Sequence, residues 1–203
     1  MKFKKTYSLI IFIVLFMTGY AQKKYITPQE FLEDSFCLAK QVMESDFQPT
    51  FLVALWRGGA PIGMAMTEYF AYKNKPIANH ITVRVSAYNH DQLKPEVYVC
   101  NLDYLVKTIK HTDKLLLVDD IIDSGSSIIA LLDEIQKRCR QNTPQDIRIA
   151  TIYYKPEAVA KIPYQIYCMH EAKNWLVFPH ELEGLTFEEI AQNKGATIAK
   201  MVS

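Results

Sequence analysis

Residues 115–127 constrain the fold most, because the chemistry of the chain changes abruptly along this short stretch. The apolar residues at 115–118 are typical of a buried strand, and the carboxylates of Asp119 and Asp120 follow them directly. A turn rich in serine and glycine at 124–127 then leads into a helical pattern. A strand, a turn and a helix in this order begin a βα unit, which predicts an α/β fold.

The rest of the chain alternates in the same way between apolar runs and helical patterns. We expect strands at residues 51–56, 81–85, 115–118, 147–154 and 164–169. We expect helices at residues 28–44, 61–72, 102–109 and 128–138, and a C-terminal helix after Thr186. This alternation predicts a mostly parallel central sheet flanked by helices, with ligands bound at the carboxyl ends of the strands.

The first predicted helix has a clear start signal. Thr27 and Glu30 have the spacing of a capping box, and Pro28 suits the first helical position. Thr186 and Glu189 repeat the box before the last helix. The apolar spacing within the first helix predicts a buried face made of Leu32, Phe36, Ala39 and Met43.

Length and composition fit one globular domain at residues 23–203, since the chain has 203 residues and 49% are hydrophobic. The net charge of +1 gives no sign of nucleic-acid binding, so we expect no nucleic-acid partner. The cysteines stand at positions 37, 100, 139 and 168 without C-x-x-C spacing. We therefore expect buried, reduced thiols and no zinc or redox site.

The turn after the paired carboxylates has the composition of a phosphate-binding site. Hydroxyls and exposed backbone N–H groups at a helix N-terminus favour an anion, and here they come from Ser124, Gly125, Ser126 and Ser127. No lysine follows the glycine, so the segment is not a P-loop. Carboxylates beside such a turn suit a sugar phosphate, because they accept hydrogen bonds from vicinal hydroxyls. The alternative is that these residues only cap the helix and form the turn.

This segment resembles the motif that binds phosphoribosyl pyrophosphate (PRPP) in type I phosphoribosyltransferases. The resemblance implies that family's α/β fold with a small hood. It implies that Asp119 and Asp120 hold the ribose hydroxyls, and that Asp123 is the catalytic group beside the imidazole nitrogens of a purine. It also implies that the 5′-phosphate is held by Ser124, Gly125, Ser126 and Ser127.

A second segment, Arg57-Gly58-Gly59, resembles the pyrophosphate loop of the same family. Glycines let a backbone approach a phosphate closely, and an arginine binds phosphate oxygens through two donors. By itself this tripeptide is typical of an ordinary turn. Its place after the predicted strand at 51–56, together with the motif downstream, indicates a pyrophosphate site.

Two further segments resemble the bacterial hypoxanthine and xanthine–guanine enzymes and indicate a 6-oxopurine. The resemblance implies that Lys155 donates to the 6-oxygen, that Trp175 stacks on the purine, and that a backbone carbonyl near Leu176 meets the base edge. The alternatives are a solvated lysine and a core tryptophan. Xanthine–guanine enzymes carry an acid two residues after the tryptophan, where this chain has Val177. The preferred 6-oxopurine therefore stays open.

The resemblance also implies Mg²⁺, contacted indirectly by Asp119 and Asp120 through ribose hydroxyls or water, and a homodimer or larger homo-oligomer. We expect the polar residues 86–95, with Tyr88, to act as a lid that excludes water. Two other functions stay open. One is a PRPP-sensing regulator without catalysis, and the other is a phosphoribosyltransferase for a different acceptor base.

Residues 1–22 form a hydrophobic leader that differs from the rest of the chain. Lysines at positions 2, 4 and 5 precede an apolar run at 7–17 and then Gly19-Tyr20-Ala21, the pattern of a secretory signal peptide. The run is shorter than the ~20 residues of a membrane-spanning helix. PRPP is made inside cells, so we expect a cytoplasmic enzyme with membrane contact only through a retained leader. Cleavage, retention and a start placed too early in the gene all stay open.

Overall fold

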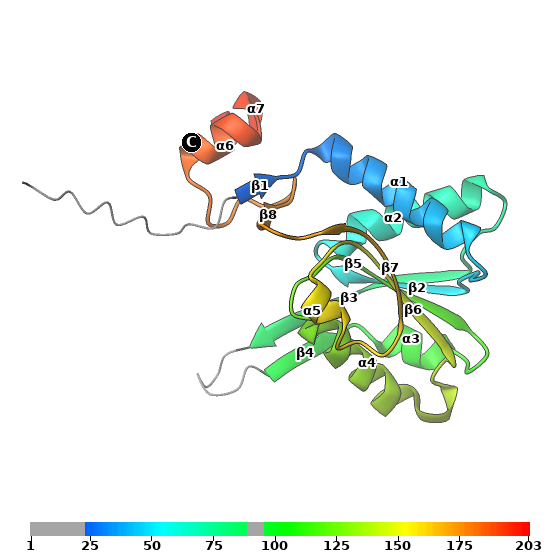
Figure 1. Ribbon diagram of the computed structural model, residues 1–203. Coiled ribbons are helices and arrows are strands. Elements are labelled where there is room, and N and C mark those ends of the chain that lie inside the picture. The colour runs from blue at the N-terminus through cyan, green and yellow to red at the C-terminus, as the bar shows by residue number, and fades with distance from the viewer. Residues whose placement is uncertain (1–22, 89–95) are drawn as a thin grey trace, which may run out of the picture.

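The computed structural model describes residues 23–88 and 96–203, which are built around a six-stranded sheet (Figure 1). In spatial order its strands are β4 (Glu96–Cys100), β3 (Asn79–Tyr88), β2 (Phe51–Trp56), β5 (Lys114–Ile122), β6 (Asp146–Tyr154) and β7 (Gln165–Glu171). Neighbouring strands are parallel, apart from the antiparallel pair of β3 and β4. The prediction of an α/β fold with a mostly parallel sheet is confirmed.

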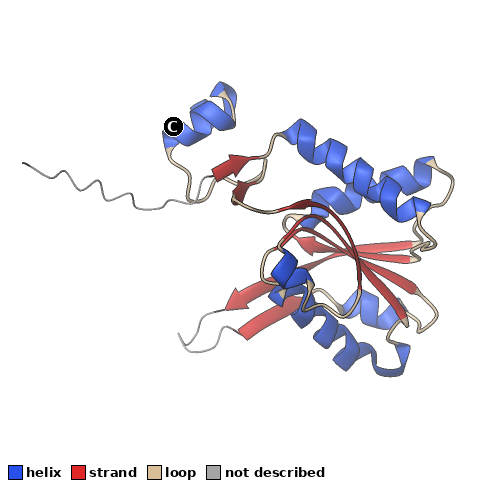
Figure 2. Ribbon diagram, viewed as in Figure 1, coloured by secondary structure: helices blue, strands red, loops and turns tan. Residues whose placement is uncertain are grey.

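Helices cover both faces of this sheet (Figure 2). One face carries α1 (Pro28–Glu44) and α2 (Gly59–Tyr72); the other carries α3 (Asp103–Thr108) and α4 (Ser126–Cys139), which a 3₁₀ turn at Arg140–Asn142 follows. Strand β2 shows why these strands are apolar throughout. Its residues Leu52 and Ala54 pack in the core with α1 and α2, whereas Phe51 and Val53 pack in the core with α3 and α4.

Strands β3 and β5 extend furthest beyond the apolar runs that predicted them. Strand β5 continues to Ile122, so Asp119 and Asp120 belong to the end of the strand and do not follow it. Strand β3 continues to Tyr88 because it pairs with β4, which the sequence did not predict. The predicted loop is therefore wrong for residues 86–88. The rest of the predicted lid, residues 89–95, and the leader, residues 1–22, lie outside the described residues.

The start of α1 is confirmed, but its predicted buried face is correct only for Ala39, which is buried, and in part for Met43, which is half-buried against the core. Thr27 Oγ1 accepts the Glu30 N–H at 3.1 Å, and the Glu30 carboxylate accepts the Thr27 N–H at 2.8 Å. Leu32 and Phe36 are exposed. The buried residues are Phe31, Ser35, Leu38, Ala39 and Val42. Both stripes have helical spacing, and contact with the sheet and with α2 selects between them.

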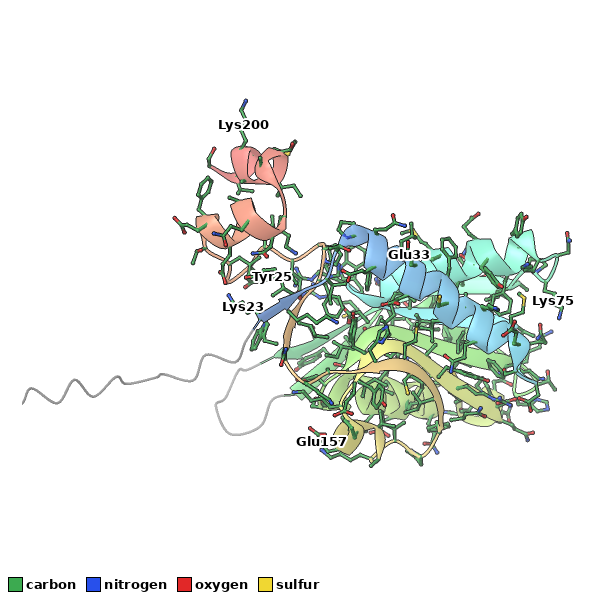
Figure 3. All side chains as sticks on the ribbon, turned by 45° about the horizontal axis from the view of Figure 1, so that its top comes forward. Lys23, Tyr25, Glu33, Lys75, Glu157 and Lys200 are labelled. Atoms are coloured by element: carbon green, nitrogen blue, oxygen red, sulfur yellow. The ribbon has the colours of Figure 1, made fainter. Side chains whose placement is uncertain are left out.

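A second, two-stranded sheet forms a hood. It pairs β1 (Lys23–Tyr25) in parallel with β8 (Trp175–Val177). Two short helices follow it, α6 (Phe187–Asn193) and α7 (Ala196–Val202), and a third, α5 (Pro156–Val159), follows β6. Lys23 and Tyr25 lie on β1 (Figure 3), and both donate to the Glu189 carboxylate of α6, at 2.7 and 2.8 Å. These bonds attach the last helices to the first strand.

The cysteines are free thiols, but the expectation that they are buried is correct only for Cys139. Cys168 is half-buried, and Cys37 and Cys100 are exposed. Within residues 23–88 and 96–203, no helix has the length and apolar character needed to cross a membrane.

Candidate active site

The paired carboxylates lie at the carboxyl end of β5, between β2 and β6. Asp119 is opposite Thr151 of β6, and its Oδ1 accepts the Asp120 N–H at 3.0 Å. Burial and the adjacent charge of Asp120 raise the pKa of Asp119. Burial also raises the pKa of Asp120, to about 6, and the negative charge of Glu181 adds to this effect. Carboxylates in this state gain from a ligand that donates hydrogen bonds or brings positive charge.

The Arg57-Gly58-Gly59 loop, which joins β2 to α2, lies directly against these acids. A Cβ atom on Gly58 would lie 1.7 Å from Asp120 Oδ2, and one on Gly59 would lie 2.3 Å from the Val118 carbonyl oxygen. Any side chain at either position would therefore have to displace the end of β5. The loop contains a cis peptide bond between Trp56 and Arg57, and Arg57 is exposed. The structure thus brings together two motifs that are distant in the sequence.

The predicted phosphate-binding turn borders a cavity of about 320 Å³. This cavity is lined by the paired acids and by Asp123, Ser124, Gly125 and Ser127. Gly125 has a φ of +81°, a left-handed conformation that suits glycine and turns the chain from β5 into α4. Ser126 begins α4, and its hydroxyl hydrogen bonds to the Ser124 hydroxyl at 2.5 Å. The groups predicted to bind ribose and phosphate therefore border one space.

A second cavity, of about 380 Å³, lies between the hood and the ends of β5 and β6. Its walls contain Asp123, Lys155, Trp175 and Leu176, the residues that the sequence assigned to catalysis and base binding. Ile121 and Asp123 line both cavities, so the two are adjacent. Trp175 is 64% exposed, which leaves its ring accessible to a planar ligand.

Lys155 and Asp123 form an ion pair with each other, a contact that the sequence did not predict. The Lys155 N–H donates to the Ile122 carbonyl at 2.9 Å, which holds the backbone of Lys155 against the end of β5. The hydrogen bond to Asp123 raises the pKa of Lys155, so this side chain stays charged. A cation and an anion side by side match a ligand edge that has an acceptor next to a donor.

The sequence analysis did not identify some of the residues that line the second cavity. Lys173 and Asn174 line it from the link between β7 and β8, and Glu181 lines it from the turn after β8. In that turn the Glu181 N–H donates to the Phe178 carbonyl at 3.0 Å, and Glu181 Oε2 accepts the Phe178 N–H at 2.9 Å. Pro179 suits the second position of such a turn, which is the signal that the sequence offers. That signal predicts the turn and says nothing of the cavity.

Solved structures similar to this chain include three purine phosphoribosyltransferases. The Pyrococcus horikoshii purine enzyme has a TM-score of 0.65 at 19% identity, over 81% of this chain and 97% of its own. The Helicobacter pylori xanthine–guanine–hypoxanthine enzyme has a TM-score of 0.59 at 23% identity, over 78% and 92%. The Leishmania donovani adenine enzyme has a TM-score of 0.54 at 12% identity, over 79% and 72%. At these identities the likeness establishes the fold alone.

No curated protein matches the chain in sequence. Residues 23–183 match the family profile described as the phosphoribosyl transferase domain. The match begins at β1 and includes both cavities. Because it covers most of the sequence, this chain belongs to the phosphoribosyl transferase domain family.

Proposed function

We propose that this phosphoribosyltransferase transfers the 5-phosphoribosyl group of PRPP to a 6-oxopurine, with release of pyrophosphate and formation of a nucleoside monophosphate. The junction of the two cavities at Ile121 and Asp123 is the observation that supports it best. One cavity offers acids and a phosphate-binding turn to PRPP. The other offers Lys155 and Trp175 to a purine, and Asp123 lies where the two substrates meet.

The Lys155–Asp123 pair supports a 6-oxopurine in preference to adenine. The 6-oxygen and N7 are neighbours on one edge of the purine. Lys155 donates to the 6-oxygen, and Asp123 accepts the proton that leaves the purine as N9 attacks, or binds the tautomer protonated at N7. Adenine has a 6-amino group at that position, for which an ammonium group has no acceptor. A polar group left unpaired in a site makes an analogue a poor substrate.

The remaining residues act on the charges that develop as the C1′–O bond of PRPP breaks. The ribose ring becomes positive, and the carboxylates of Asp119 and Asp120 favour it while accepting its two hydroxyls. In our proposal the leaving pyrophosphate binds at the Arg57-Gly58-Gly59 loop, where the exposed Arg57 guanidinium binds its oxygens. The turn at residues 124–127 binds the 5′-phosphate.

Asp119 and Asp120 also fit an indirect Mg²⁺ contact, because Mg²⁺ is usually held by one or two carboxylates together with substrate phosphates and water. In the described part of the chain, no cluster of three or more His, Cys, Asp or Glu side chains could hold a metal on its own. Bound Mg²⁺ would supply positive charge that neutralises the pyrophosphate. In our proposal Asp119 and Asp120 would contact the ion only indirectly, through ribose hydroxyls or water.

We further propose a homo-oligomer with its catalytic domain in the cytoplasm, where PRPP is made. The hydrogen bonds of Lys23 and Tyr25 to Glu189 join residues of the predicted domain at 23–203. Removal of residues 1–22 would leave those hydrogen bonds in place.

An activity panel tests the proposal. The protein is incubated with PRPP, Mg²⁺ and one base at a time, and nucleotides are separated by chromatography. We expect 5′-monophosphates from 6-oxopurines and an efficiency with adenine lower by about tenfold or more. Lys155→Met should lower turnover of 6-oxopurines, whereas Lys161→Met, at an exposed position outside the cavity, should not. If the protein binds PRPP but forms no product with any base, a PRPP-sensing regulator without catalysis is favoured. If only a pyrimidine gives a product, a phosphoribosyltransferase for a different acceptor base is favoured.

A further inference from the structure

The cavity of about 380 Å³ proposed to bind the purine, called the base cavity below, has a second carboxylate, Glu181, that the proposed function does not use. Asp123 and Lys155 come from the ends of β5 and β6, whereas Glu181 comes from the turn after β8 in the hood. The two acids differ in their partners. Asp123 is paired with Lys155. In the described residues no cation forms an ion pair with Glu181, not even Lys173 in the same cavity.

The turn holds Glu181 in place from both its backbone and its side chain. Its N–H donates to the Phe178 carbonyl, and its Oε2 accepts the Phe178 N–H. Phe178 is only 3% exposed, and Lys194 Nζ also donates to its carbonyl. The side chain of Glu181 is therefore attached to a buried part of the hood. The bond to Phe178 uses Oε2, so the carboxylate keeps acceptor capacity for a ligand.

The neighbouring strand offers no competing acceptor from a side chain. Leu176 and Val177 are apolar, and Val177 is only 2% exposed. The charge of Glu181 acts on Asp120, the acid that lies toward the ribose. Glu181 is thus the carboxylate that the hood adds to the cavity, and it comes from a different element than Lys155.

The 6-oxopurines differ at position 2, the atom that such a carboxylate would distinguish. With the 6-oxygen at Lys155 and the ring on Trp175, the edge with N1 and C2 is left for another wall of the cavity. Guanine has N–H donors on this edge, hypoxanthine lacks the 2-amino group, and xanthine has a 2-oxygen that a carboxylate repels. Resting on the function proposed above, we propose that Glu181 selects guanine among the 6-oxopurines by accepting a hydrogen bond from its 2-amino group.

The test compares wild type with Glu181→Gln, in which the amide oxygen still accepts the Phe178 N–H while the charge is lost. Glu183→Gln is the matched control, because Glu183 is exposed in the same loop and does not line the cavity. We measure kcat/KM for guanine, hypoxanthine and xanthine. A hydrogen bond to a charged group is worth about a 10- to 100-fold difference in kcat/KM. We therefore expect the wild type and Glu183→Gln to prefer guanine over hypoxanthine by about this factor. Glu181→Gln should lose most of this preference, and its ratio of kcat/KM for xanthine to kcat/KM for hypoxanthine should rise.

An unchanged guanine-to-hypoxanthine ratio in Glu181→Gln would overturn the inference, and so would a wild type that prefers hypoxanthine or xanthine. If Glu181→Gln does not fold, calorimetry on the wild type replaces it, and GMP must bind more tightly than IMP and XMP. Equal binding of the three would refute the role of Glu181. A wild type that uses hypoxanthine without preferring guanine contradicts this inference alone. A wild type that uses no purine contradicts the proposed function as well.

Discussion

Asp120→Asn should stabilise the substrate-free protein at neutral pH, although it removes a predicted substrate-binding group. The pKa of Asp120 is about 6 in the folded protein against an ordinary value of 3.8, because burial disfavours its charged form. At about 1.36 kcal/mol per pKa unit, this difference of about two units corresponds to about 3 kcal/mol. The folded protein binds this proton more tightly than the unfolded chain does. Stability therefore falls as the pH rises from about 4 to about 6, and the full cost applies above pH 6.

Urea unfolding of wild type and variant at about pH 7.5 and about pH 4 measures this effect. We expect Asp120→Asn to be more stable by up to about 3 kcal/mol at the higher pH and equal at the lower, since asparagine has no charge to bury. Asp133→Asn, at an exposed position of α4, is the control and should change little. An Asp120→Asn variant no more stable than wild type at about pH 7.5 would refute the argument that this carboxylate is held at a cost. PRPP should bind the variant more weakly, as expected where a site gives up stability for function.

Four further predictions concern other parts of the chain. Asp123→Asn should lower turnover by about 10²- to 10⁴-fold with little change in PRPP affinity, measured by steady-state kinetics and calorimetry. Gly58→Ala should weaken PRPP binding strongly, because the new Cβ atom would lie 1.7 Å from Asp120 Oδ2. Calorimetry with PRPP and the folded variant measures this loss. A chain that starts at Lys23 should fold and turn over substrate like the full chain. A chain that starts at Ile26 should show a raised KM for the base, because it lacks the strand that pairs with β8.

The parts of the fold that the sequence predicted well are those determined by local contacts. Both capping boxes, at Thr27 and at Thr186, form as predicted because their hydrogen bonds join residues three apart. Strand β2 has the predicted bounds because it is buried on both faces and so reads as an unbroken apolar run. The candidate site could be predicted for the same reason. Its acids and its predicted phosphate-binding turn occupy one contiguous segment at the end of β5, and they line one cavity.

The parts that the sequence missed depend on contacts between distant residues. Strands β1 and β8 are three residues each, too short for a periodic pattern, and they exist because they pair with each other across most of the chain. Strand β4 was missed for a similar reason, because it is defined by its antiparallel pairing with β3. The predicted buried face of α1 was wrong for Leu32 and Phe36, because two stripes on that helix satisfy the same spacing. The side chain of Glu181 reaches the base cavity only because the hood folds over the main sheet.

The groups predicted to bind PRPP and those predicted to bind the base stand on different parts of the fold. The predicted PRPP groups stand on β2, β5 and α4, whose strands are hydrogen bonded within the six-stranded sheet. Trp175, Leu176 and Glu181 stand on the hood, which is held by β1 and by the bonds of Lys23 and Tyr25 to Glu189. We therefore expect substitutions at Trp175 or Leu176 to change the base that is accepted without disturbing the acids predicted to hold the sugar phosphate. A change at Glu181 also removes a charge that acts on Asp120. Only Ile121 and Asp123 border both cavities among the described residues, so a change at Asp123 affects both halves at once.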